Sequence, residues 1–336
     1  MKPPLRWGVL GTAGIARTQV VPAIQASSNG RVTAIAGRDL SRCEQFASEF
    51  AIANVFGTHD ALLASPDVDA VYIPLPNSLH GEWAMRAADA GKAVLCEKPL
   101  ALNALEARRV VDHFADRGVP LMEGFMYRFH PQSLHVLECV RDDLIGDVLE
   151  VRAHLSVDIM EHATGNIRFS SAFGGGSLLD MGCYGVNAAR RIIGAEPVSV
   201  FGRFDVDAES GVDLSASAIL EFPGERCALV SSSFKASGQG FYQVIGSTGL
   251  LEVPRSFIPG MGSRAAEALV IHVDADGHRK ETAFEPVDQY RLMVEAFADA
   301  VLSGNPVPNS PEDAVANMRV LDAIAASARS GKREEV

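Results

Sequence analysis

The fold class is indicated most clearly by Leu5–Ala16, LRWGVLGTAGIA. Its apolar first half runs straight into Gly11, and an amphipathic segment, Ile15–Ala26, follows. A strand, a glycine turn and a helix in this order place a helix N-terminus against a pyrophosphate in dinucleotide-binding folds. Ala13 and Ala16 stand where the fingerprint usually has glycine. The turn alone is a weak signal, and its place at the first strand of a series strengthens it. The expected phosphate-binding residues are Gly11, Thr12, Ala13, Gly14 and Ile15.

Short apolar runs alternate with amphipathic segments from this turn to about residue 125. The expected strands are Leu5–Leu10, Val32–Ala36, Val68–Ile73, Ala93–Cys96 and Pro120–Glu123. The expected helices are Ile15–Ala26, Leu40–Phe50, 78–90 and Ala104–Arg117. Such alternation predicts parallel strands joined by right-handed crossovers, as in a doubly wound Rossmann sheet. We therefore expect an α/β protein whose residues 1–125 form a dinucleotide-binding domain.

The pattern changes after Pro131, and residues 126–336 are expected to form a second, substrate-binding and oligomerisation domain. Residues 198–282 are expected to be mostly strands, because apolar and polar residues alternate there with a period of two. This predicts an α+β domain with a large open, mainly antiparallel sheet. The expected helices are Gln132–Val140, Ser177–Ile193, Asp288–Ser303 and Pro311–Ser330, the last of which is free to pack back on the first domain.

Composition excludes several classes of protein. The chain has 336 residues, 47% of them hydrophobic, and a net charge of −12. It is therefore not a disordered chain, and its acidity argues against a nucleic-acid or membrane-surface binder. The sequence contains no apolar run long enough to predict a membrane span. The five cysteines are scattered without a Cys-x-x-Cys motif, which favours free thiols and a cytoplasmic location. The nine histidines form no motif typical of a metal site, so no metal is expected.

The end of the second expected strand points to the choice of cofactor. An acid at this place usually holds the ribose hydroxyls of NAD, but this chain has Gly37-Arg38. The charge and planar geometry of Arg38 suit a 2′-phosphate, so NADP(H) is expected in preference to NAD(H). The alternative makes Arg38 a solvated loop residue and Asp39 the ribose ligand.

Four segments carry a resemblance to a known family. They are Tyr72–His80 (YIPLPNSLH), Gly91–Pro99 (GKAVLCEKP), Glu123–Pro131 (EGFMYRFHP) and Gly174–Tyr184. In this order they resemble the glucose–fructose oxidoreductase / inositol dehydrogenase / MocA-type family. Many members have histidine where this chain has Tyr184. The tyrosine resembles the aldose (xylose-type) dehydrogenase and dihydrodiol dehydrogenase branch.

The resemblance implies the site residues. The implied catalytic residues are Lys98, Tyr184 and Asp180, and the substrate is expected to contact these three and Arg168. The implied cofactor contacts, besides the glycine turn, Gly37 and Arg38, are Pro76, Asn77, His80, Glu97, Lys98 and Arg128. From the residues alone, Lys98 could also be a solvated surface lysine. Asp180, Tyr184 and Asn187 share one helix face, which could be merely a wet one.

The expected function is hydride transfer between NADP and a cyclic sugar or polyol in carbohydrate metabolism. Oxidation of an aldose at C1 to a lactone, or a reverse carbonyl reduction, fits the resemblance. Two alternatives stay open: an aldose–aldose (glucose–fructose type) oxidoreductase with non-dissociating NADP, and a non-catalytic sugar- or cofactor-sensing regulator. The family further implies a homodimer or homotetramer assembled through the C-terminal sheet.

Overall fold

The computed structural model describes residues 3–259 and 268–336. The chain forms two compact units, Met1–Met126 with Asp288–Val315, and Tyr127–Val287 with Ala316–Val336. Residues 288–315, expected with the second domain, thus pack with the first unit. The reason is α8, which lies on β1, β2 and α1 and brings Phe297 within 5.2 Å (ring centroids) of the buried Trp7.

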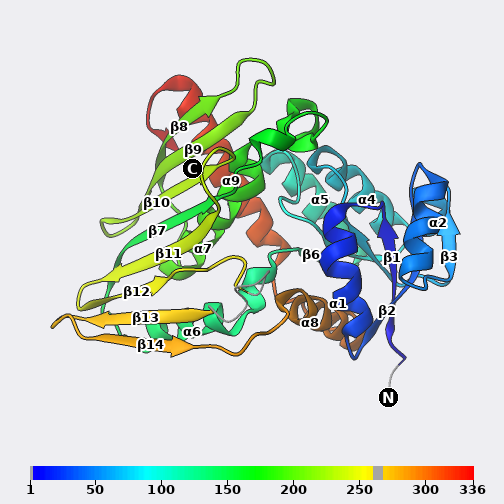
Figure 1. The fold of residues 1–336 in the computed structure, drawn as a ribbon, viewed down its shortest axis with the longest axis horizontal. Helices are drawn as coiled ribbons and strands as arrows, with labels where there is room; N and C mark the ends of the chain where they lie inside the picture. The colour runs from blue at the N-terminus through cyan, green and yellow to red at the C-terminus, as the bar shows by residue number, and fades with distance from the viewer. Residues whose placement is uncertain (1–2, 260–267) are drawn as a thin grey trace. The chain divides into compact units, whose positions relative to one another are not determined.

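The first unit contains a six-stranded sheet in the order β3-β2-β1-β4-β5-β6, and every neighbouring pair is parallel. This confirms the expected Rossmann sheet (Figure 1). Its strands are β1 Leu5–Leu10, β2 Gly30–Ala36, β3 Asn54–Phe56, β4 Ala70–Ile73, β5 Ala93–Cys96 and β6 Leu121–Glu123. Its helices are α1 Val21–Ala26, α2 Leu40–Glu49, α3 His59–Leu63, α4 His80–Asp89, α5 Ala104–Arg117 and α8 Gln289–Ser303.

The helix after the glycine turn is wider than an α-helix over Ala16–Val20, which forms a π turn before α1. Pro22 explains this locally, because it has no N–H to donate to the carbonyl four residues earlier. The N–H of Val21 instead donates to the carbonyl of Ala16, five residues earlier.

The second unit contains a nine-stranded sheet in the order β14-β13-β12-β11-β7-β10-β9-β8-β15. Its pairs are antiparallel except β10 with β7, so the expected mainly antiparallel sheet is confirmed as a mixed one. The strands are β7 Val148–Ser156, β8 Ser199–Val206, β9 Asp213–Phe222, β10 Arg226–Ser233, β11 Gln239–Gly246, β12 Gly249–Val253, β13 Leu269–Asp274, β14 Arg279–Ala283 and β15 Glu334–Glu335. The expected run of strands includes residues 260–267, which lie outside the described residues.

Helices cover one face of this sheet. They are α6 Pro131–Arg141, α7 Cys183–Ile193 and α9 Pro311–Ser330 (Figure 1). Gly185 of α7 lies against Val230 and Ala153, and Gly202 of β8 lies against Ile324 of α9. Along each strand, every second side chain packs against these helices, and the side chains between them point to the opposite face of the sheet. Along the whole described chain, none of the helices has both the length and the hydropathy needed to cross a bilayer.

Candidate active site

The glycine turn forms an open backbone surface at a helix N-terminus. Gly11 has φ +101°, a conformation that favours glycine, and its N–H donates to the carbonyl of Ala36 at 2.7 Å. The helix begins at Gly14, and a Cβ built there would meet no atom within 4 Å. Thr12, Ala13 and Ile15 are partly exposed around it. Open backbone at a helix start is what a pyrophosphate needs, so these residues fit a dinucleotide despite the alanine at 13.

The end of β2 lies beside this turn. A Cβ on Gly37 would lie 3.9 Å from the Cα of Gly11. Arg38 is exposed, and Asp39 is the N-cap of α2, where its carboxylate accepts the N–H of Arg42 at 3.1 Å. Asp39 thus caps α2, while the Arg38 side chain is open to solvent.

His80, one of the expected cofactor contacts, lies between two backbone carbonyls. Its side chain is fully buried, and its two ring nitrogens lie 2.7 Å from the carbonyl of Pro99 and 2.8 Å from that of Leu75. Burial lowers the pKa of His80, against the raising effect of both carbonyls. Both ring nitrogens thus lie at hydrogen-bond distance from backbone, while Pro76 and Asn77 remain partly exposed before His80.

Glu97 and Lys98 follow β5 and are both partly exposed. The buried hydroxyl of Tyr72 donates to the Glu97 carboxylate at 2.6 Å. Burial, and next the Glu97 charge, raise the pKa of Tyr72 well above its usual value, so Tyr72 stays a donor. This bond fixes the Glu97 carboxylate next to the position of Lys98. Arg128, the other implied cofactor contact, is partly exposed in the short helical turn Met126–Phe129.

In the second unit the structure brings together Arg168 and Asp180, two of the four residues expected to bind the substrate. The Nε of Arg168 donates to Asp180 Oδ2 at 2.7 Å. Asp180 lies in a π turn, Leu178–Gly182, that continues into α7, where Tyr184 stands. Three expected residues therefore come from one helix and the loop that leads into it.

Glycines 174–176 hold that loop on the helix. A Cβ on Gly175 would collide with the carbonyl of Arg168, and one on Gly176 would collide with the Asp213 carboxylate. The N–H of Gly176 donates to the carbonyl of Arg168 at 2.9 Å. The absence of side chains at Gly175 and Gly176 thus allows the backbone of Arg168 and the Asp213 carboxylate to approach closely.

Asp213 is a residue that sequence reasoning missed. It accepts the hydroxyl of Ser177 at 2.8 Å and the N–H of Leu178 at 2.7 Å, so it caps the start of the π turn that carries Asp180. Burial raises its pKa, with the two donors opposing that effect. No local pattern signals this role, because Asp213 starts a strand far along the chain.

Tyr184 is 6% exposed and lies in an aromatic cluster. Its ring centroid is 5.9 Å from that of Tyr127 and 5.5 Å from that of Phe257. The hydroxyl of Tyr127 donates to Asn187 Oδ1 at 2.6 Å. Tyr184 and Asn187 are buried, so the polar face of this helix is not the wet one that the alternative reading assumed.

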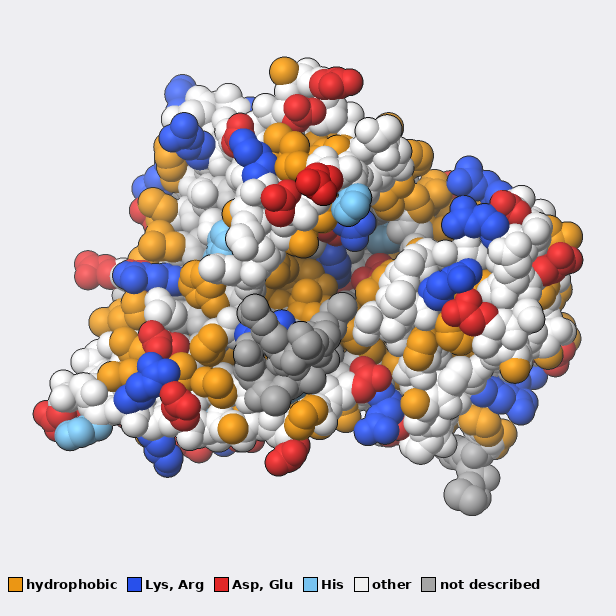
Figure 2. Space-filling view, viewed as in Figure 1, with side chains coloured by type: hydrophobic (Ala, Val, Ile, Leu, Met, Phe, Trp, Pro, Cys, Tyr) orange, Lys and Arg blue, Asp and Glu red, His pale blue; other side chains and the backbone are white. Residues whose placement is uncertain are grey.

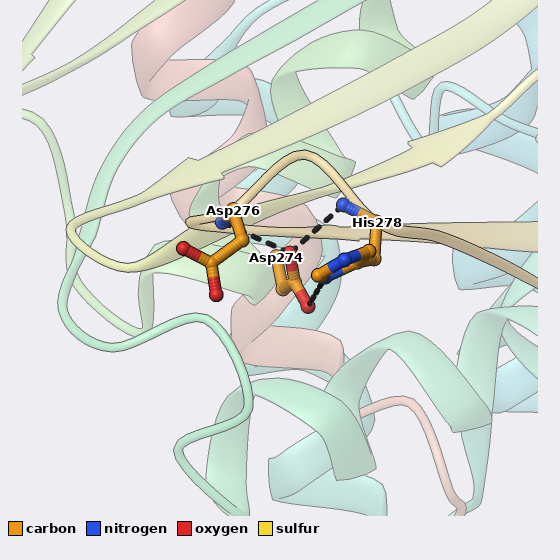
Figure 3. Close-up of side chains that lie close together, drawn as sticks. All are labelled: Asp274, Asp276 and His278. Atoms are coloured by element: carbon orange, nitrogen blue, oxygen red, sulfur yellow. Dashed lines mark hydrogen bonds and ion pairs between the residues drawn. The ribbon is translucent and has the colours of Figure 1, made fainter.

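Within the described residues one group has the spacing of metal ligands, Asp274, Asp276 and His278 in the turn between β13 and β14 (Figure 3). The Asp274 carboxylate accepts the N–H of Asp276 at 3.0 Å and that of His278 at 2.9 Å. The His278 ring lies 3.1 Å from Asp274 and is mostly exposed. The three side chains lie close together because these hydrogen bonds form the hairpin turn between β13 and β14.

Comparison with known proteins gives matches along most of the chain. Residues 5–125 match an oxidoreductase family with an NAD-binding Rossmann fold, and residues 134–252 match the GFO/IDH/MocA C-terminal domain. D-xylose 1-dehydrogenase (NADP(+)) 2 of Haloferax volcanii is 41% identical over 99% of this chain and 100% of its own length. A dTDP-3,4-didehydro-2,6-dideoxy-alpha-D-glucose 3-reductase of Actinomadura kijaniata is 36% identical over 97% of this chain and 96% of its own.

Solved structures agree. The 3-ketoreductase KijD10 of Actinomadura kijaniata, in complex with NADP and TDP-benzene, has a TM-score of 0.89 at 33% identity, over 96% of this chain and 98% of that one. An aldose–aldose oxidoreductase of Caulobacter crescentus, complexed with glycerol, has a TM-score of 0.90 at 27% identity, over 99% and 100% of the two chains.

Proposed function

Since this chain belongs to the GFO/IDH/MocA family of oxidoreductases, we propose that it oxidises the anomeric carbon of a free aldose to a lactone, with NADP as cofactor. The similarity to an NADP-dependent D-xylose 1-dehydrogenase extends over 99% of the chain and supports this substrate class. The five cysteines are all free, which fits a reducing cytoplasmic compartment.

The first unit holds the cofactor. The open backbone at Gly11 and Gly14 accepts the pyrophosphate, and the exposed Arg38 meets the 2′-phosphate. NADP, when bound, supplies the acceptor for the hydride that leaves the sugar carbon. Glu97, fixed by Tyr72, binds toward the nicotinamide end.

Tyr184 and Lys98 handle the proton. Oxidation of a hemiacetal carbon requires a base that takes the proton of its hydroxyl. A tyrosine with the ordinary pKa of about 10 is a poor base at neutral pH unless a positive charge stabilises its phenolate. Lys98 supplies that charge and holds the sugar oxygen while Tyr184 takes the proton.

The pairing of Arg168 with Asp180 is the observation that favours a free sugar over a diphosphate-linked sugar as substrate. The guanidinium is compensated by the carboxylate, so the pair offers a donor and an acceptor without net positive charge. Neighbouring sugar hydroxyls both donate and accept, and they suit such a pair. A diphosphate-linked sugar would instead require uncompensated cations.

A substrate panel tests the proposal. Pyranoses including D-xylose, inositols and dihydrodiols are each incubated with NADP, and NADPH formation is followed by absorbance. We expect turnover with at least one aldopyranose and formation of its lactone. Turnover limited to inositols or dihydrodiols would overturn the assignment to aldoses.

A second candidate is an aldose–aldose oxidoreductase that keeps its NADP bound. The likeness to the Caulobacter crescentus enzyme, over 99% of this chain, favours it. Purified protein incubated with two aldoses and no added NADP distinguishes the two functions. A dehydrogenase forms product only in proportion to carried-over cofactor, whereas an aldose–aldose oxidoreductase turns over repeatedly.

The open face of the nine-stranded sheet supports a homodimer. Phe201, Ile219 and Leu229 are paired across β8, β9 and β10 and are 46%, 45% and 39% exposed. Figure 2 shows hydrophobic side chains among charged ones over the strands of this unit. An exposed apolar row with a polar surround favours a partner, and a second copy presents the same row. Light scattering should give a dimer or tetramer, and Ile219→Glu should give monomers; a monomeric wild-type protein would refute the interface.

A further inference from the structure

His80 joins two loops of the first unit. It is the first residue of α4 and has no exposed surface. Its Nδ1 lies 2.7 Å from the Pro99 carbonyl, in the turn after β5, and its Nε2 lies 2.8 Å from the Leu75 carbonyl, in the loop after β4. Both oxygens are acceptors, so the ring donates to both of them when it is protonated and to one of them when it is neutral, and in either form it lies between loops at the carboxyl ends of neighbouring parallel strands.

The Leu75 end of this bridge rests on the glycine turn. A Cβ on Gly11 would lie 3.2 Å from Cδ2 of Leu75, so the side chain fills the space beside the turn. The loop that His80 holds is therefore packed against the backbone that accepts the pyrophosphate.

The Pro99 end controls the backbone that carries Lys98. The next N–H, of Leu100, donates to the buried carboxylate of Glu123 at 2.8 Å. The Pro99 carbonyl is held by the His80 ring and the Leu100 N–H is held by the Glu123 carboxylate, so both ends of this peptide are fixed. Displacing the Pro99 carbonyl would rotate the Pro99–Leu100 peptide and shift the backbone at Lys98, one residue earlier.

We propose that His80 is a positioning residue that couples the cofactor-binding glycine turn to Lys98 through Leu75 and Pro99. The inference rests on the proposed catalytic role of Lys98. It replaces a direct contact between His80 and the cofactor with an indirect one, because both ring nitrogens are already used. Loss of the Pro99 bond should impair catalysis, and loss of the Leu75 bond should impair cofactor binding.

Two substitutions separate the two bonds. The amide nitrogen of asparagine replaces Nδ1, so His80→Asn keeps the bond to Pro99 and loses that to Leu75. The amide nitrogen of glutamine replaces Nε2, so His80→Gln does the opposite. We expect kcat to fall in His80→Gln on the order of 10–100-fold, as for a catalytic group displaced by about 1 Å. We expect His80→Asn to retain more kcat but to bind NADPH more weakly than His80→Gln.

A substrate-free measurement reports on Lys98 directly. Acetylation by a lysine reagent is followed by mass spectrometry, with Lys235 of the second unit as internal reference. The relative rate at Lys98 should change several-fold in His80→Gln and stay unchanged in His80→Asn. His113, which pairs with Asp89 on the surface of α5, provides matched controls, and neither His113→Asn nor His113→Gln should alter Lys98.

The outcomes decide between coupling and mere support of the fold. Equal losses of kcat in both His80 variants, in step with their melting temperatures and with unchanged Lys98 acetylation, would overturn the proposal. If both variants fail to fold, ring-nitrogen NMR of the wild-type protein decides, because NADP titration should shift the His80 signals and not those of His113. Unshifted His80 signals would overturn it. Failure of the proposed function appears separately, as a wild-type protein that turns over no sugar, and leaves the acetylation and NMR tests valid.

Discussion

Arg168 and Asp180 form an ion pair, with the Arg168 Nε 2.7 Å from Asp180 Oδ2. The Arg168 side chain is 46% exposed and that of Asp180 is 20% exposed. The pair is therefore accessible from solvent while its two charges compensate each other. Backbone bonds from the glycine triplet hold it in place, so it offers hydroxyl groups a fixed donor and acceptor.

The first prediction concerns this pair. Asp180→Ala and Arg168→Ala should each raise KM for the sugar by roughly 10-fold or more, because each removes a charged hydrogen-bond partner. NADPH binding by fluorescence titration should stay the same. Lys235→Ala, which breaks an exposed pair with Asp205 in the same unit, is the control and should leave KM unchanged. An unchanged KM in both Asp180→Ala and Arg168→Ala would exclude the pair from sugar binding.

The second prediction concerns cofactor choice. Arg38→Ala should weaken NADP binding roughly 10–100-fold, the loss expected for hydrogen bonds to a charged phosphate, and leave NAD nearly unchanged. Arg31→Ala, an exposed arginine at the opposite end of β2, should affect neither. Isothermal titration with both cofactors measures the ratio, and an equal loss for NADP and NAD would contradict the assignment of Arg38.

The third prediction concerns acid stability. His130 caps α6 by accepting the N–H of Gln132 at 3.1 Å, and burial lowers its pKa from 6.5 to about 4. The folded state thus prefers neutral His130, and the stability this contributes is present above pH 6.5 and lost as the pH falls toward 4. Between pH 7 and 5 the free energy of unfolding should fall by ~2 kcal/mol through this group.

His130→Asn tests it, because asparagine caps helices without titrating. Urea unfolding at pH 7 and pH 5 should show a smaller loss in this variant than in the wild type. His135→Asn, at a half-buried position of the same helix, is the control and should follow the wild type. The same loss in His130→Asn as in the wild type would show that another group is responsible.

The fold could largely be predicted from the sequence where periodicity is long. The strand Leu5–Leu10 and the helix Ala104–Arg117 have the expected bounds, because one is apolar apart from Arg6 and the other carries a capped amphipathic pattern. The strand Asn54–Phe56 and the helix His59–Leu63 were missed, since such short elements carry no measurable period.

The residue types of the candidate site come from the sequence, and their hydrogen-bond partners come from the fold. Lys98, Tyr184 and Arg38 follow from motifs, whereas the bond of Tyr72 to Glu97 and the cap by Asp213 depend on residues brought together by the fold. His80 shows the difference best. Its motif marks it as important, but only the positions of two distant carbonyls show that its ring is fully engaged.

The fourth prediction is that Tyr184 and Lys98 act together in proton transfer. Lys98→Met should lower kcat about as much as Tyr184→Phe, and the double variant should lose far less than the product of the two, as for groups that act as a unit. Losses that multiply would mean that the two residues act independently.

Proton transfer by Tyr184 is tested most directly by kcat for NADPH formation from D-xylose, or the best aldose of the panel, in Tyr184→Phe. We expect a fall of about 10²–10⁴-fold, the usual contribution of general acid–base catalysis, with NADPH binding unchanged. Tyr127→Phe removes a hydroxyl from the same aromatic cluster, where it bonds Asn187, and should lose far less. Near-normal kcat in Tyr184→Phe would exclude Tyr184 as the base.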